Sequence, residues 1–267
     1  MQYTLKDIKE SLPKKKNSRS SLWVRFFIRK LSFPFTYLFI NMGWTANMVS
    51  LLSWVVIFIA SVLLSINNFW FMLVGVILTN FWLVLDCVDG NIARCKKEKT
   101  FMGDFFDAIA GYGPFAFTTI GLGMAAYHTS FLIGSEYHYI FIIIAAIGAV
   151  ANIYTRLIHQ KYLTCYFSAK NYLNELEDIN LKDTENKKSF AYIREQIDKN
   201  FGVSGIFMPW LFVALFTNTF DIMLVVYSAY YCLSFLLVIV LYCKKAVAFE
   251  KEKLEKRKAI EAEVENI

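Results

Sequence analysis

Six apolar runs divide this chain, and they constrain its fold more than any other feature of the sequence. A helix needs about 20 residues to cross the roughly 30 Å of bilayer hydrocarbon, and most of the runs approach that length. They cover approximately residues 47–66, 69–85, 105–127, 139–158, 203–216 and 222–242. The sequence therefore predicts an all-α integral membrane protein, built as a bundle of six transmembrane helices.

The fifth run, 203–216, is the shortest and contains Pro209. A membrane helix accommodates proline only where neighbouring groups satisfy the carbonyl that loses its hydrogen-bond donor. The composition nevertheless excludes a soluble domain, because 57% of the residues are hydrophobic and 17% are aromatic. A short turn at Asn67 and Asn68 joins the first two runs and predicts a helical hairpin.

The 28 lysine and arginine residues all fall in segments on one side of this six-span map, and the opposite loops contain none. Because basic residues near the ends of spans stay in the cytoplasm, both termini are predicted to be cytoplasmic. Topology and attraction to anionic lipid headgroups explain the formal net charge of +6, so no nucleic-acid partner is expected. The expected protein is multi-pass and contacts membrane lipids.

Polar segments flank and interrupt the spans. The expected parts are an N-terminal cytoplasmic or interfacial segment at 1–46, a six-span membrane domain at 47–243 with a cytoplasmic insert at 160–202, and a charged helical tail at 244–267. Residues 20–41 mix aromatic with basic side chains, as in an amphipathic helix that lies in the membrane interface, and Pro34 is expected to break it. Within the insert, two weakly amphipathic helical stretches are expected at 162–179 and 190–201.

Four aspartates gather where the second run ends and the third begins. Asp86 and Asp89 are three residues apart, as are Asp104 and Asp107, so each pair shares one face of a helix. Ionisable groups at the edge of hydrocarbon are costly enough to indicate a functional site. Carboxylates without nearby thiolates or histidine suit Mg²⁺ or Mn²⁺, ions that commonly serve phosphates.

Two neighbours of these aspartates suit a phosphate. Gly90 lets a phosphate approach the backbone, and Arg94 presents a fork of donors to it. The alternative is purely structural, with the carboxylates forming interfacial salt bridges. Their partners would be Arg94, Lys96, Lys97 and Lys99.

The spacing of these residues resembles the signature of the CDP-alcohol phosphotransferase family, also called the CDP-alcohol phosphatidyltransferase family. Seven positions match at the family's spacing: Asp86, Asp89, Gly90, Ala93, Arg94, Gly103 and Asp107. The segment Gly43-Trp-Thr45-Ala-Asn47 also resembles the Gly-x-Thr-Pro-Asn start of the family's first span, with Ala46 in place of proline. The resemblance is specific over residues 43–111 and extends to the six-span plan.

This resemblance implies a reaction in which an acceptor attacks the β-phosphorus of a CDP-linked alcohol and CMP leaves. It implies that 47–243 is a catalytic domain, that the active site is cytoplasmic and that the protein forms a homodimer. The metal ligands implied by the family motif are Asp86, Asp89 and Asp107. The residues implied around the nucleotide are Asn47, Gly90, Ala93, Arg94 and Gly103.

The acceptor is less constrained than the nucleotide. Family members combine either a lipid-linked CDP donor with a small polar acceptor, or a small CDP-alcohol with a lipid acceptor. Arg156 and Lys161 follow the fourth run on the cytoplasmic side and are candidates for binding an anionic headgroup, although ordinary anchoring explains them equally well. A transporter is the alternative from another class, but it would place ionisable or broken positions near the bilayer midplane, whereas these acids gather at one membrane face.

The chain departs from the family signature at one position. A further aspartate, the family's general base and a ligand of its second metal, is expected four residues beyond Asp107, where this chain has Gly111. In one interpretation Asp104 supplies the missing carboxylate as the base. In a second, the acceptor is an anionic polyprenyl phosphate that needs no base. In a third, the chain binds nucleotide without turning it over.

Overall fold

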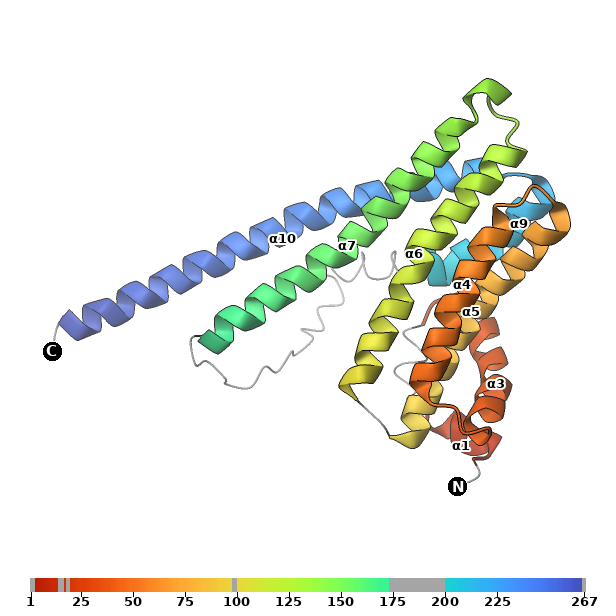
Figure 1. Ribbon diagram of the computed structural model, residues 1–267. Coiled ribbons are helices and arrows are strands. Elements are labelled where there is room, and N and C mark those ends of the chain that lie inside the picture. Colours follow the sequence, from red (N-terminus) through yellow and green to blue (C-terminus); the bar gives the residue numbers. More distant parts are fainter. Residues whose placement is uncertain (1–2, 14–16, 18–19, 98–99, 173–199, 266–267) are drawn as a thin grey trace.

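The computed structural model describes residues 3–13, 17, 20–97, 100–172 and 200–265, and all of its regular structure over these ranges is helical (Figure 1). In chain order the elements are α1 (Leu5–Glu10), η1 (Val24–Ile28), α3 (Arg29–Asn41), α4 (Ala46–Leu64), α5 (Phe69–Lys96), α6 (Phe101–Thr129), η2 (Ser135–Tyr137), α7 (Tyr139–Tyr172), η3 (Val203–Phe207), α9 (Met208–Thr217) and α10 (Phe220–Glu265).

Five helices in the described ranges are long and apolar enough to cross a membrane. They are Ala46–Leu64, Phe69–Lys96, Ala108–Thr129, Ser135–Ala169 and Phe220–Glu255. This finding confirms the predicted all-α integral membrane fold. The predicted fifth span forms only the shorter apolar helix Val203–Thr217, in which Pro209 lies in the first turn of α9 and therefore removes no hydrogen bond from the middle of the helix. The count of six spans stays a prediction.

Side-chain caps fix the starts of the helices that form the centre of the bundle. Thr45, Asn68 and Thr100 each accept a hydrogen bond from a backbone N–H in the first turn of α4, α5 and α6 respectively. Such caps satisfy donors that a helix leaves unpaired at its start. Gly43 precedes α4 with φ +82°, a conformation that favours glycine. Local sequence thus sets both the α4–α5 hairpin and the point where α6 begins.

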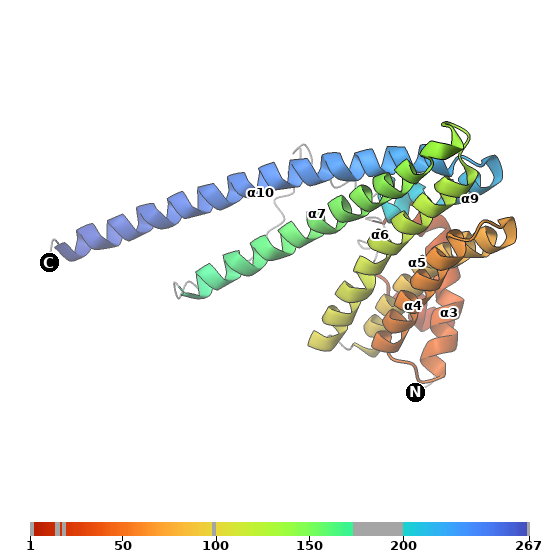
Figure 2. The ribbon, with the colours of Figure 1, turned by 45° about the horizontal axis from the view of Figure 1, so that its top comes forward.

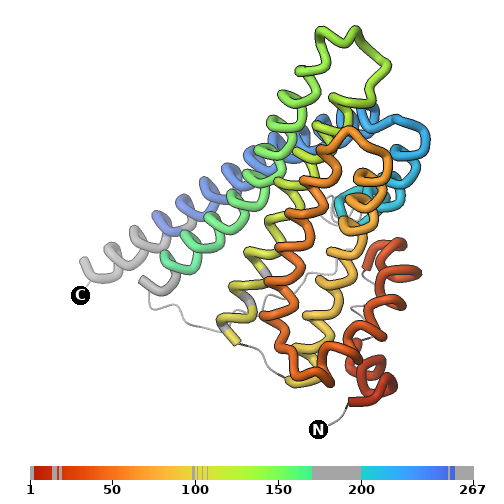
Figure 3. Tube along the Cα trace, turned by 45° about the vertical axis from the view of Figure 1, so that its right-hand side comes forward, coloured from red at the N-terminus to blue at the C-terminus, as the bar shows by residue number. Residues whose placement is uncertain are grey.

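Helix α4 lies between α5 and α6 and packs against both (Figure 3). Small residues allow close approach where helices cross, because a Cβ at Gly123 would lie 2.3 Å from the Cβ of Ala145, and one at Gly148 would lie 2.4 Å from Ser228 Oγ. Packing of this kind is the main source of helix association in a bilayer, where burial of apolar surface gives little advantage. These contacts join α6 to α7 and α7 to α10.

The long helices α7 and α10 run side by side in the same direction and extend away from α3, α4 and α5 (Figure 2). Ring contacts show the shared direction, because Tyr154 meets Phe235 and, further along both helices, Tyr166 meets Phe249. Both helices continue beyond the apolar runs with which they begin. Helix α7 continues into the expected insert as far as Tyr172, and α10 continues through the charged tail to Glu265. Residues 173–199 of the insert lie outside the described ranges, and with them most of its second helical stretch.

The N-terminal region differs from the expectation in one respect. Pro34 does not break a helix, because it lies inside α3 and its ring is exposed. A proline in a helix removes one backbone hydrogen bond, and packing of α3 along α5 offsets that loss. The irregularity lies upstream instead, in the five-residue π-helix η1. Helix α3 places one buried face against α5, while its interfacial position in the membrane stays a prediction.

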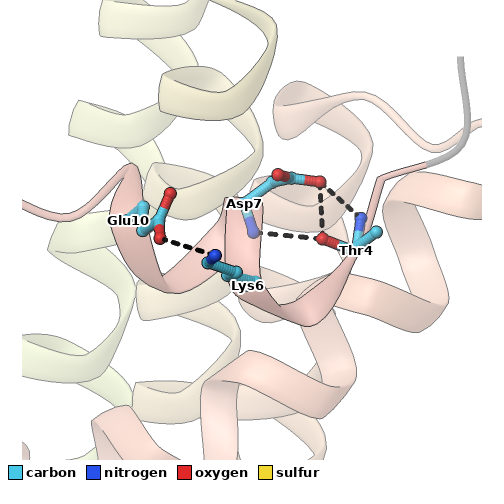
Figure 4. Close-up of polar contacts among 4 residues, drawn as sticks. All are labelled: Thr4, Lys6, Asp7 and Glu10. Atoms are coloured by element: carbon cyan, nitrogen blue, oxygen red, sulfur yellow. Dashed lines mark hydrogen bonds and ion pairs between the residues drawn. The ribbon is translucent and has the colours of Figure 1, made fainter.

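The short helix α1 docks at the end of α5 through both polar and apolar contacts. Its own start is a capping box, in which Thr4 Oγ1 donates to Asp7 Oδ2 at 2.6 Å and the Asp7 N–H donates back to Thr4 (Figure 4). Ile8 is fully buried, and the Tyr3 backbone pairs with the Asn41 amide at 3.0 and 3.1 Å. These contacts hold α1 beside the C-terminal end of α3, and the contact of Ser11 with Cys95 places it beside the C-terminal end of α5 as well.

Candidate active site

The first half of the predicted signature lies on the last turns of α5. The helix continues without interruption to Lys96, so Asp86, Asp89, Gly90 and Ala93 follow one another at helical spacing on one face. Asp86 is half-buried, and Asp89 is only 5% exposed. A charged carboxylate at that depth needs partners. The continuous helix confirms that Asp86 and Asp89 share one face, as the sequence predicted.

Ser50 of α4 is one partner of Asp89. Its hydroxyl donates to Asp89 Oδ2 at 2.6 Å, and the other carboxylate oxygen accepts the N–H of Gly90 at 2.5 Å. Ser50 was not predicted from the sequence, because a serine inside an apolar run carries no spacing signal toward a residue 39 positions away. The one feature of the sequence that could have indicated Ser50 is its position one helical turn beyond Asn47. The bond fixes the orientation of a predicted metal ligand.

Arg94 is held by a chain of buried hydrogen bonds. Its Nη2 donates to Asn91 Oδ1 at 2.6 Å, and Asn91 is fully buried. The Asn91 amide donates in turn to Thr36 Oγ1 at 3.0 Å and to Ser32 Oγ at 3.3 Å on α3. Asn91, which occupies a variable position inside the matched motif, was not predicted from the sequence either. The N-terminal helix thus sets the position of the motif's arginine.

Gly90 provides the space that the Arg94 guanidinium occupies. A Cβ at Gly90 would lie 3.2 Å from Arg94 Nη1, tighter than ordinary contact. The sequence predicted a different role for Gly90, in which the lack of a side chain lets a phosphate approach the backbone. That role stays a prediction. In the structure, any side chain at Gly90 would press on the arginine.

The start of α6 meets the start of α4. Thr100 caps α6 by accepting the Gly103 N–H at 3.0 Å, and a Cβ at Gly103 would lie 3.6 Å from Asn47 Oδ1. Helix α4 therefore contacts both halves of the signature, through Ser50 on one side and Asn47 on the other. The predicted role of Asn47, Gly103 and the α5 residues around a nucleotide stays a prediction.

Asp104 and Asp107 lie in the first turns of α6 by backbone position, but their side chains are outside the described part of the chain. Among the side chains that are described, no group of three His, Cys, Asp or Glu residues could hold a metal ion. The donor set still fits a hard divalent cation, because Asp86 and Asp89 offer carboxylate oxygens one turn apart. The metal site stays a prediction.

Gly111 faces open space. A Cβ placed there would have no heavy atom within 4 Å, so a Cβ fits at this position without a clash. One turn further along α6, the Arg156 guanidinium of α7 lies 3.5 Å from the centre of the Phe115 ring. The structure thus brings Arg156 to α6 near the position of the missing acid. Lys161, the other headgroup candidate, is exposed on α7.

The fold and this site define a class, a multi-pass helical membrane protein with acidic and basic groups gathered where one span ends and its neighbours begin. Residues 43–171 match the model of the CDP-alcohol phosphatidyltransferase family. The match confirms the resemblance drawn from the signature. Comparison with the curated proteins gave no match. The family places the chain among the membrane transferases of lipid synthesis that take a phosphoalcohol group from a CDP-alcohol.

Proposed function

We propose that the protein transfers a phosphoalcohol group from a CDP-alcohol to an acceptor at the cytoplasmic face of the membrane, releasing CMP, with Mg²⁺ or Mn²⁺ as cofactor. The observation that carries this proposal is that a buried carboxylate and an arginine, each held by a hydrogen bond, lie five residues apart at the C-terminal end of α5. Asp89 is fixed by Ser50, and Arg94 is fixed by Asn91. A homodimer, as the resemblance implies, is part of the proposal.

The carboxylates of Asp86, Asp89 and Asp107 would hold the divalent cation. When bound, such an ion neutralises charge on the diphosphate and stabilises the leaving CMP. Ser50 contributes by orienting Asp89, since hydrogen bonds to ligating carboxylates commonly tune metal affinity tenfold or more. Asn91 contributes by directing the fork of Arg94, which is suited to bind phosphate oxygens.

The transfer is a substitution at the β-phosphorus of the donor. The acceptor oxygen forms a bond to that phosphorus, and the bond from the β-phosphorus to the oxygen of CMP breaks. Where the acceptor is an alcohol, its proton passes to Asp104, which replaces the acid absent at Gly111. Asn47, Gly90, Ala93 and Gly103 surround the nucleotide.

A second candidate is transfer to an anionic acceptor such as a polyprenyl phosphate. Arg156 favours it, because its guanidinium lies over Phe115, four residues beyond Gly111. A cation there would attract an acceptor phosphate, and an acceptor that is already an anion loses no proton. In this case Asp104 has no role as a base.

The test is CMP release by purified protein, with Mg²⁺ or Mn²⁺ and a panel of CDP-alcohols, each with neutral and anionic acceptors. Acceptor-dependent release supports the proposal, and its absence with every pair would refute both candidates and leave a non-catalytic nucleotide-binding protein. Asp104→Asn then separates the two. Loss of release indicates a neutral acceptor and a base, whereas full retention indicates the anionic acceptor.

A further inference from the structure

Arg29 is a buried arginine that the matched motif does not include. It opens α3 and is only 6% exposed. One terminal nitrogen donates to Ser20 Oγ at 2.6 Å, but Nε is buried without a hydrogen-bond partner in the described structure. A buried guanidinium with an unpaired donor is costly. Its retention therefore calls for an explanation.

Arg29 belongs to the same network as Arg94. It shares a helix face with Ser32 and Thr36, three and seven residues further along α3, and this face is buried against α5. Ser32 and Thr36 accept from Asn91, and Asn91 holds Arg94. The charge of Arg29 lies near enough to act on Arg94, as does the opposite charge of Asp89.

Arg94 repeats the pattern of Arg29. Its Nε is also buried without a hydrogen-bond partner in the described structure. Two guanidinium groups with buried, unused donors at the edge of hydrocarbon are unfavourable unless a further acceptor binds them. A phosphate group fits this requirement, because it presents several acceptor oxygens to two planar forks of donors.

We propose that Arg29 and Arg94 together form a phosphate-binding site, with the N-terminal helix α3 supplying one of its two arginines. The phosphate comes either from the diphosphate of the donor or from the headgroup of an anionic membrane lipid. The first source rests on the proposed function, and the second does not. In both cases Arg29 is a binding residue contributed from outside the 43–171 domain.

The experiment measures equilibrium binding without turnover. Wild type, Arg29→Gln and Arg29→Lys are reconstituted in nanodiscs of neutral phosphatidylcholine, and their affinity for CDP and for cytidine is measured with EDTA present. A second set of nanodiscs contains phosphatidylglycerol, and its enrichment around the protein is measured. The matched control is Arg25→Gln, which removes an exposed positive charge from the neighbouring helix η1.

If the donor supplies the phosphate, Arg29→Gln weakens CDP binding roughly tenfold to a hundredfold and leaves cytidine binding unchanged. If a lipid supplies it, Arg29→Gln abolishes the enrichment of phosphatidylglycerol. Arg29→Lys, which keeps the charge and loses the fork, gives an intermediate effect in the responding assay and guards against misfolding of the glutamine variant. Arg25→Gln behaves as wild type in both.

Unchanged CDP affinity and unchanged lipid enrichment in folded Arg29→Gln and Arg29→Lys overturn the proposal. Equal losses in Arg25→Gln overturn it too, since they would reflect charge in general. The result is independent of the CMP-release assay. A protein that releases no CMP can still show the Arg29 effect, and an active enzyme can lack it.

Discussion

Ser50 shows how a single hydroxyl can matter to a metal site that it does not itself enter. It donates to Asp89 Oδ2 at 2.6 Å, whereas Ser53, one turn along, is equally buried but donates to the Ser50 backbone carbonyl. We expect Ser50→Ala to raise the Mg²⁺ concentration for half-maximal CMP release about tenfold, because Asp89 loses its orienting bond. Ser53→Ala should leave this concentration unchanged. Equal Mg²⁺ requirements in the two variants would contradict the role of Ser50.

Gly111 allows the missing acid to be restored. Since a Cβ at this position meets no atom within 4 Å, we expect Gly111→Asp to fold with the melting temperature of wild type. If Asp104 is the base, the double change Asp104→Asn with Gly111→Asp should recover most of the CMP release that Asp104→Asn loses. Release is measured with a neutral acceptor. A folded double variant as inactive as Asp104→Asn would mean that an acid at position 111 cannot replace Asp104.

At the scale of elements, two adjacent threonines of α6 have opposite environments. Thr119 Oγ1 donates to the Phe115 carbonyl at 3.0 Å, while Thr118 Oγ1 is buried without a partner in the described structure. We expect Thr118→Val to stabilise the protein by about 1 kcal/mol, raising the melting temperature by about 2–4 °C, because it removes an unpaired hydroxyl. Thr119→Val should lower the melting temperature. A loss of stability in Thr118→Val would show that its hydroxyl is bonded.

Helix α1 should loosen in acid. Hydrogen bonds from the Thr4 hydroxyl and backbone N–H lower the pKa of Asp7 below 3.8 (Figure 4). A lowered pKa in the folded state gives stability that is present above pH 3.8 and lost as the pH falls through the folded value. We expect faster hydrogen exchange in α1 below that pH, after correction for the intrinsic pH dependence. Asp7→Asn should remove this change, and an identical pH response in that variant would contradict the assignment.

Sequence patterns predicted the elements better than their contacts. The apolar runs and the Asn67–Asn68 turn predicted the α4–α5 hairpin, and the i,i+3 aspartates predicted a shared face, because both follow from the period of one helix. Ser50 and Asn91 were missed because each acts through a partner on another helix. The predicted helix break at Pro34 was wrong for the same reason. Local propensity suggests a break there, but packing of α3 against α5 overrides it.

At the scale of the whole molecule, the directions of the helices support an even number of crossings. Helix α1 lies at the C-terminal end of α5, where Cys95 contacts Ser11. Helix α6 begins at that same end, α7 returns toward it from the far end of α6, and α10 runs in the direction of α7 (Figure 1). Between α7 and α10 the chain must therefore travel back, and the described part of this return is η3 and α9.

Such a return is what the predicted placement of both termini on one side requires of a chain with five long helices. Phe216, near the end of α9, contacts the ring of Phe69 at the start of α5, while Ser204 in η3 accepts from Ser21 of the N-terminal region. Helices η3 and α9 thus lead toward the end of the bundle at which α5 begins. In this arrangement the short predicted fifth span is one part of a crossing. The positive-inside pattern separately predicts that both termini are cytoplasmic.

A labelling experiment tests this topology. Two single-cysteine variants are needed. One keeps Cys243 and has the other four cysteines changed to serine. The other has all five changed to serine and carries Phe131→Cys, which replaces an exposed residue between α6 and α7. We expect a membrane-impermeant maleimide to label Cys243 only in inside-out vesicles and the cysteine at position 131 only in right-side-out vesicles, because three crossings, by α7, by the return that includes η3 and α9, and by α10, separate the two positions. Labelling of both positions from one side would mean that η3 and α9 do not complete a crossing, and would leave the protein with five spans and its termini on opposite faces.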